Sequence, residues 1–160
     1  MSLFELNRER GQGARIAGVD LKRMAMVERE QRLAAHILIV DDYDDSREMY
    51  AEMLSFAGYQ VVTAKDGEEA LERAEKEHFD LIVLDLALPK VDGITVIRSL
   101  RTRPATKDVP IITLSASVGQ NAHQAVRAAG GDLALDKPCL PDDLEARIRT
   151  FLQRDRPAGE

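Results

Sequence analysis

Three short segments of this chain are apolar at nearly every position, and this continuity constrains its fold more than any other feature. Residues 37–40 read Ile-Leu-Ile-Val, residues 81–84 read Leu-Ile-Val-Leu, and residues 109–114 read Val-Pro-Ile-Ile-Thr-Leu. A strand with one face in solvent alternates apolar and polar residues, so unbroken apolar runs predict strands that are buried on both faces. Strands of this kind form a parallel sheet with helices packed on both sides.

Weaker strand patterns and amphipathic segments fill the rest of the chain in alternation. Residues 60–64 and 132–135 predict two more strands, and their weaker apolar character places them at the edges of the sheet. Five helices are predicted between the strands, with these residues facing the core: Met49, Met53 and Phe56; Ala70, Leu71 and Ala74; Ile94, Val96, Ile97 and Leu100; Ala122, Ala125, Val126 and Ala129; Leu144, Ile148, Phe151 and Leu152. The alternation predicts an α/β fold, a doubly wound five-stranded parallel sheet in the flavodoxin-like order 2-1-3-4-5, with an N-terminal extension.

The N-terminal extension lacks this pattern. Residues 1–19 contain three glycines and no periodic apolar pattern, so we expect a flexible segment there. Residues 20–35 favour a helix of unknown role with a thin apolar stripe. It is either an idle extension, a segment ahead of a translation start at Met24 or Met26, or a docking or dimerisation helix. We expect the folded domain over residues 36–154 and a loose tail over 155–160.

Composition narrows the environment and the partners. The 160 residues include 22 Lys and Arg against 28 Asp and Glu, a net charge of −6, which argues against nucleic acid as a partner. The single cysteine, Cys139, excludes an internal disulfide and fits a reducing compartment. The sequence has neither a membrane-spanning apolar run nor the apolar core of a signal peptide. We therefore expect a cytoplasmic protein without a membrane partner.

Polar residues follow the predicted strands at the point where each strand ends. Asp41 and Asp42 follow the first strand, Asp85 the third, Ser115 the fourth and Lys137 the fifth. The carboxyl ends of parallel strands meet at one edge of the sheet, where three carboxylates would repel one another without a cation. Mg²⁺ suits such a carboxylate cluster, and a hydroxyl and an ammonium beside it could hold phosphoryl oxygens. The pattern predicts a site that moves or holds a phosphoryl group.

These residues closely resemble the receiver domain of two-component response regulators. The resemblance covers residues 36–153 and rests on four segments in the family's order and spacing: Ile37–Asp42, Asp80–Gly93, Pro110–Ala116 and Asp136–Pro138. It implies that Asp85 accepts a phosphoryl group from a phosphohistidine of a sensor kinase. It also implies the remaining site residues: Asp41, Asp42, Asp85 and the backbone carbonyl of Ala87 for Mg²⁺, with Asp41 acting through water; Ser115 and Lys137 for the phosphoryl oxygens; and a cis bond before Pro138.

The chain departs from the family pattern at positions that affect switching and turnover. Ala134 stands three residues before the lysine, where receivers usually carry a switching Tyr or Phe, and Cys139 follows Lys-Pro, where Phe is common. In the family, the positions of Ala87 and Ser117 flank the water that hydrolyses the phosphoaspartate. Neither residue brings an acid or an amide, so we expect slow self-dephosphorylation.

The expected function is that of a stand-alone response regulator with a phosphorylation-switched protein-binding surface, and not that of an enzyme. Its partners would be a sensor histidine kinase or phosphotransfer protein and a downstream protein target. Candidate docking residues, from helical phase, are His123, Gln124, Arg127, Arg147 and Gln153. One alternative is a degenerate receiver that binds partners without phosphorylation. Another is a Mg²⁺-dependent phosphatase, although relatives of the haloacid dehalogenase group usually carry an acid where Ala87 stands.

Overall fold

The computed structural model describes residues 15–16, 18–116 and 119–154, and the chain divides into two units after Ala34. The N-terminal unit contains the strands β1 (Arg15–Ile16) and β2 (Val19–Asp20) and the helix α1 (Leu21–Leu33). Residues 1–14 and 17 of the segment expected to be flexible, and the expected loose tail over residues 155–160, lie outside the described residues. At the end of the N-terminal segment, β1 and β2 pair in antiparallel fashion. Gly18, with φ of 82°, supplies the left-handed conformation that the turn between them needs.

The second unit alternates strand and helix five times. Its elements are β3 (His36–Val40), α2 (Asp44–Phe56), β4 (Gln60–Ala64), α3 (Gly67–Lys76), β5 (Leu81–Asp85), α4 (Gly93–Arg101), β6 (Ile111–Ser115), α5 (Gln120–Ala129), β7 (Leu133–Asp136) and α6 (Pro141–Arg154). The strands pair in parallel in the order β4-β3-β5-β6-β7. Counted along the chain, this order is 2-1-3-4-5, which confirms the predicted topology and places both weaker strands at the edges.

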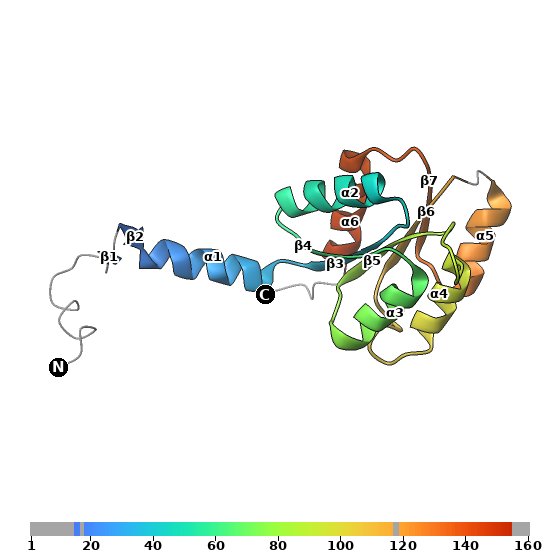
Figure 1. Cartoon of the computed structure of the whole chain (residues 1–160), viewed down its shortest axis with the longest axis horizontal. Helices are drawn as coiled ribbons and strands as arrows, with labels where there is room; N and C mark the ends of the chain where they lie inside the picture. Colours follow the sequence, from blue (N-terminus) through green and yellow to red (C-terminus); the bar gives the residue numbers. More distant parts are fainter. Residues whose placement is uncertain (1–14, 17, 117–118, 155–160) are drawn as a thin grey trace. The chain divides into compact units, whose positions relative to one another are not determined.

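Helices cover the sheet on both faces, with α2 and α6 on one side and α3, α4 and α5 on the other (Figure 1). The strand β3 shows how the continuous apolar runs serve this arrangement. Ile37 and Ile39 face the α2 and α6 side, whereas Leu38 and Val40 face the opposite layer, and all four are at most 1% exposed. The two layers therefore form separate cores that share the sheet.

The buried face of α2 differs from the prediction. Met49 is 44% exposed and Phe56 is 96% exposed, whereas Tyr50 and Leu54 are the buried residues of this helix. Of the three predicted residues, only Met53 packs against the core, and it is half-buried. The apolar stripe chosen from the sequence is therefore rotated by about one residue, or roughly 100° of helical phase. On α5, Ala125 is likewise exposed, and Val126 and Ala129 provide its buried surface.

A single arginine organises the segment between α4 and β6. Arg101, whose side chain is only 18% exposed, donates hydrogen bonds to four backbone carbonyls and pairs with Asp132 at 2.9 Å. The carbonyls, at 2.7–3.1 Å, belong to Thr106, Lys107, Val109 and Gly130. The guanidinium thus connects this segment to the turn between α5 and β7. The guanidinium lies near the amino end of β6, at the edge of the sheet that does not carry the carboxylates.

None of the helices in the described part of the chain has the length and apolar character needed to cross a membrane.

Candidate functional site

Three carboxylates meet at the carboxyl ends of β3 and β5. Asp41 and Asp42 directly follow β3, and Asp85 is the last residue of β5, the neighbouring parallel strand. One oxygen from each of the three lies within 4.8 Å of the others. Asp41 is 2% exposed and Asp85 is 7% exposed, while Asp42 is open to solvent. The topology thus concentrates negative charge at one edge of the sheet.

Lys137, which follows β7, brings a positive charge to this cluster. Its Nζ donates a hydrogen bond of 2.9 Å to Asp85 Oδ2 and lies 3.5 Å from Asp41 Oδ2. Burial disfavours the charged ammonium, but the hydrogen bond and charge of Asp85, together with Asp41, outweigh burial and raise the pKa of Lys137 above its usual 10.5. The lysine is therefore an ammonium at neutral pH.

The loop after β5 holds the other oxygen of Asp85. The backbone N–H of Ala87 donates to Asp85 Oδ1 at 2.9 Å. At the start of α4, a Cβ on Gly93 would lie 2.7 Å from the Cα of Leu86 and 2.9 Å from the carbonyl oxygen of Asp85. Only glycine fits there without displacing this backbone. The close approach of α4 therefore contributes to the position of the carboxylate.

The remaining predicted residues occupy the ends of β6 and β7. Ser115 ends β6 and is 6% exposed, and its carbonyl accepts a hydrogen bond of 2.8 Å from the N–H of Lys137. Ala134, in β7, is opposite Thr113 in the register of the sheet and is half-buried. The peptide bond between Lys137 and Pro138 is cis, the conformation that the resemblance implies. Ser117 lies outside the described residues.

The first turn of α2 adds residues that the sequence analysis did not select. Asp41 Oδ1 accepts a hydrogen bond from the N–H of Tyr43 at 2.9 Å, and Asp41 Oδ2 accepts one from the Ser46 hydroxyl at 2.5 Å. Arg47 Nη1 donates to the backbone carbonyl of Asp41 at 2.9 Å. In the sequence, Ser46 and Arg47 have the spacing of ordinary first-turn helix residues, so local pattern gave no sign of this contact.

Tyr50, in the middle of α2, supports the segment that carries the lysine. Tyr50 is 4% exposed, and its hydroxyl donates to the carbonyl of Cys139 at 2.7 Å. Burial, with a smaller contribution from Asp143, raises the pKa of the Cys139 thiol. Because thiolates are the reactive form of cysteine, this environment favours a packing role for Cys139 over redox sensing.

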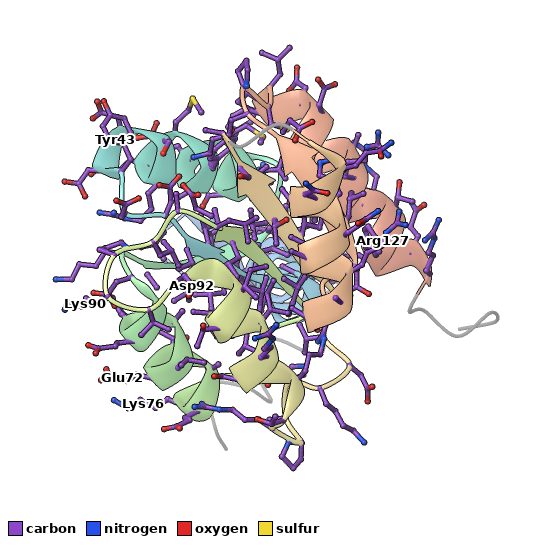
Figure 2. The ribbon with its side chains drawn as sticks, turned by 90° about the vertical axis from the view of Figure 1, so that its right-hand side faces the viewer. Tyr43, Glu72, Lys76, Lys90, Asp92 and Arg127 are labelled. Carbon is purple, nitrogen blue, oxygen red and sulfur yellow. The ribbon has the colours of Figure 1, made fainter. Side chains whose placement is uncertain are left out.

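The candidate docking residues lie on α5 and α6. Gln124, Arg127, Arg147 and Gln153 are exposed. His123 is half-buried, and its Nε2 lies 3.0 Å from Asp136 Oδ1, which links α5 to the end of β7. Figure 2 shows Arg127 on one side of the domain, and Tyr43 and Lys90 on the side where α2 and α3 lie.

The donor set fits a hard divalent cation. Carboxylate and carbonyl oxygens are the ligands that Mg²⁺ prefers, and it binds through one or two carboxylates with water completing its coordination. Asp42 is open to solvent and Asp41 and Asp85 are buried beside it, so a cation here would contact both protein oxygens and water. The same edge offers Lys137 and Ser115 as donors to an anion.

The flavodoxin-like sheet and this carboxylate-lysine cluster define the receiver class of signalling domains. The family model "Response regulator receiver domain" matches residues 37–149, and the chain belongs to this family. Receiver domains are signalling modules of two-component systems that bind Mg²⁺ at an acidic pocket and interact with histidine kinases or phosphotransfer proteins.

Curated relatives are longer than this chain. The probable transcriptional regulator ycf27 of Cyanophora paradoxa is 46% identical over 122 residues, which cover 74% of this chain and 48% of the relative. Response regulator MprA of Mycobacterium leprae (strain TN) is 42% identical over 121 residues, which cover 76% and 52%. The chain thus spans about half the length of the curated relatives it matches.

Solved receiver structures align with this chain over almost their whole length. The chemotaxis response regulator CheY4 of Vibrio cholerae is 34% identical, with a TM-score of 0.71, and the match covers 74% of this chain and 98% of that one. The receiver domain of sensor histidine kinase PA1611 from Pseudomonas aeruginosa PAO1 is 30% identical, with a TM-score of 0.70 and coverage of 75% and 98%. That structure has a magnesium ion coordinated in its active site cleft.

Proposed function

We propose that this chain is a response regulator that accepts a phosphoryl group on Asp85 from a phosphohistidine of a sensor histidine kinase or phosphotransfer protein. The observation that carries the proposal is the cluster of three carboxylates within 4.8 Å, in which Asp85 is already held by Lys137. A phosphoryl acceptor needs an aligned carboxylate and nearby positive charge, and both are present here.

In the proposed transfer, one carboxylate oxygen of Asp85 forms a bond to phosphorus. The bond between phosphorus and the donor's imidazole nitrogen breaks, and that nitrogen keeps the electron pair. The Ala87 N–H and the Lys137 ammonium each hold one oxygen of Asp85, so the carboxylate is oriented before the donor arrives. This preorganisation matters because a loose phosphoryl-transfer transition state depends mainly on alignment and charge neutralisation.

Asp42, Asp85 and the backbone carbonyl of Ala87 would hold Mg²⁺, with Asp41 acting through water. When bound, the cation neutralises charge on the phosphoryl oxygens and on the carboxylates. Lys137 would then pair with a phosphoryl oxygen, and the Ser115 hydroxyl would donate to another. Ser115 ends β6 and Lys137 directly follows β7, the neighbouring strand, and the hydrogen bond from the Lys137 N–H to the Ser115 carbonyl joins them. A shift of one would be transmitted to the other.

The proposed output is a change in the protein-binding surface formed by α5, β7 and α6. Four of the five candidate residues there are exposed, and the link from the half-buried His123 to Asp136 connects α5 to the strand that leads to Lys137. With Ala134 in place of an aromatic residue, backbone movement after β6 and β7 would carry the signal. The partner then distinguishes the phosphorylated from the unphosphorylated protein if it binds the surface with different affinity in the two conformations.

The direct test is the mass of the intact protein after incubation with acetyl phosphate and Mg²⁺. We expect one added phosphoryl group on the wild type and none on Asp85→Asn. Asp92→Asn, which changes an exposed aspartate in the same loop region, should still accept the group. No adduct on the wild type, together with no binding of beryllofluoride, would contradict the proposal.

Ala87→Asn should shorten the lifetime of the phosphorylated state severalfold. The exposed Ala87 methyl cannot orient a water molecule, whereas an amide at this position offers both a donor and an acceptor beside Asp85. The measurement is the decay of the phosphorylated mass after removal of acetyl phosphate. Ala87→Leu has a similar size without hydrogen-bonding groups and should not accelerate the decay. An Asn variant with the wild-type lifetime would disprove this explanation of slow turnover.

A further inference from the structure

The first turn of α2 holds Asp41 through both of its carboxylate oxygens. The Tyr43 N–H occupies Oδ1 at 2.9 Å, and the Ser46 hydroxyl occupies Oδ2 at 2.5 Å. Two donors on two different oxygens determine the plane of the carboxylate as well as its position. Of these two donors, only the Ser46 hydroxyl belongs to a side chain, since the Tyr43 donor is a backbone N–H.

The Ser46 hydroxyl has an alternative partner, and the distances favour Asp41. The Tyr43 carbonyl lies 3.2 Å from Ser46 Oγ, which is the ordinary local bond of a first-turn serine. A hydroxyl has one hydrogen to donate, and the carboxylate is both nearer and charged, so it is the stronger acceptor. Ser46 therefore acts on Asp41 and not mainly on its own helix.

Lys137 also lies near Asp41 Oδ2, at 3.5 Å, but it cannot be the group that keeps Asp41 in place during the reaction. Its nearer partner is Asp85, and in the proposed function it moves to a phosphoryl oxygen. Ser46 is uncharged and sits on a helix, so a cation or phosphoryl group in the site would not draw it away. A neutral hydroxyl also leaves the negative charge of Asp41 available to a cation.

We propose that Ser46 is a positioning residue of the divalent-cation site. Its hydroxyl holds the buried Asp41 carboxylate in the orientation in which an oxygen lies within 4.8 Å of oxygens of Asp42 and Asp85. The inference rests on the proposed function, because it concerns the same cation site. Without the hydroxyl, Asp41 can rotate toward Lys137, and the site must be reorganised before it binds Mg²⁺.

The test is a titration of Mg²⁺ into the full chain, followed by backbone amide chemical shifts. Ser46→Ala should raise the Kd for Mg²⁺ about tenfold, the low end for loss of a residue that orients a metal ligand. Ser46→Thr keeps the hydroxyl and should restore near-wild-type affinity. The amide spectrum itself reports whether each variant is folded.

Thr95→Ala is the matched control. Thr95 also lies in the first turn of a helix and donates its hydroxyl to a carboxylate, Asp92 Oδ2, at 3.1 Å, but outside the three-carboxylate cluster. This variant should leave the Kd for Mg²⁺ unchanged, even if its melting temperature falls. Equal Mg²⁺ affinity of Ser46→Ala and the wild type would overturn the inference while leaving the proposed function intact. Absence of Mg²⁺ binding by the wild type would overturn both.

Discussion

Replacing Lys137 with methionine should slow phosphorylation of Asp85 by about a hundredfold or more, while the affinity for Mg²⁺ stays equal or increases. The ammonium is 2.9 Å from Asp85 Oδ2 and is the group proposed to meet the phosphoryl oxygens, and loss of one such donor costs about 100-fold to 1,000-fold in rate. For Mg²⁺ the effect has the opposite sign, because the variant removes a positive charge that competes for the same carboxylates.

These opposite signs make the Lys137→Met experiment specific. The rate is measured from the time course of the intact mass with acetyl phosphate, and Mg²⁺ affinity from amide chemical shifts. Lys90→Met is the matched control: Lys90 also lies near two carboxylates, Asp66 at 3.6 Å and Glu68 at 3.8 Å, but its exposed side chain projects away from the sheet (Figure 2). It should change neither quantity. A parallel loss of Mg²⁺ affinity in Lys137→Met would indicate general disruption of the site and contradict the assigned role.

Arg101→Met should lower the free energy of unfolding by about 3 kcal/mol or more. The guanidinium makes five hydrogen bonds to two separate segments, residues 106–109 and 130–132. Hydrogen bonds that involve a charged partner contribute about 1.5–3 kcal/mol each, without adding fully. The ion pair with Asp132 adds little to this figure, because the Asp132 side chain is 40% exposed and water screens the attraction. The segment before β6 would lose its organising side chain.

Urea unfolding followed by circular dichroism measures the Arg101→Met effect. Arg98→Met changes an exposed arginine one turn earlier in α4 and should alter the free energy of unfolding by only about 0.5 kcal/mol. Arg101→Lys should be nearly as unstable as the methionine variant, because an ammonium cannot reproduce the planar fork that reaches several carbonyls at once. A stable lysine variant would show that charge alone suffices and that the guanidinium geometry is unimportant.

The strands and the cluster of Asp41, Asp85 and Lys137 could both be predicted from the sequence, and for the same reason. In a parallel sheet, strand ends converge at one edge, so Asp41, Asp85 and Lys137 could be brought together without knowledge of any side-chain contact. The burial of β3, β5 and β6 on both faces also follows from local composition, since Thr113 is the only polar residue within their apolar runs.

The buried face of α2 could not be predicted in the same way. Met49, Met53 and Phe56 satisfy helical spacing, but Tyr50 and Leu54 also satisfy it, and the sequence contains both stripes. The choice depends on a contact that is remote along the chain, the hydrogen bond from the Tyr50 hydroxyl to the carbonyl of Cys139, 89 residues later. Tyrosine is favoured at the buried position because its ring packs while its hydroxyl finds a partner.

Ser46 and Arg101 were missed for a related reason. Each lies at a helix end where its residue type is common, a hydroxyl in a first turn and a cation in a last turn. Most of the hydrogen-bond partners of Arg101 are backbone carbonyls, which every residue has and which therefore leave no mark in the sequence. Such roles become visible only when the coordinates are known.

The reactive groups and the exposed helix residues lie on different parts of the fold, and this affects how the sequences of receiver domains can change in evolution. The reactive groups sit at the ends of β3, β5, β6 and β7, where the backbone of the sheet sets their positions. Exposed side chains such as Met49 and Phe56 on α2, or Arg127 on α5, contribute little to that framework. After gene duplication, substitutions on these helices can therefore change which partner a copy recognises while its chemistry is retained. Parallel signalling routes can in this way become insulated from one another.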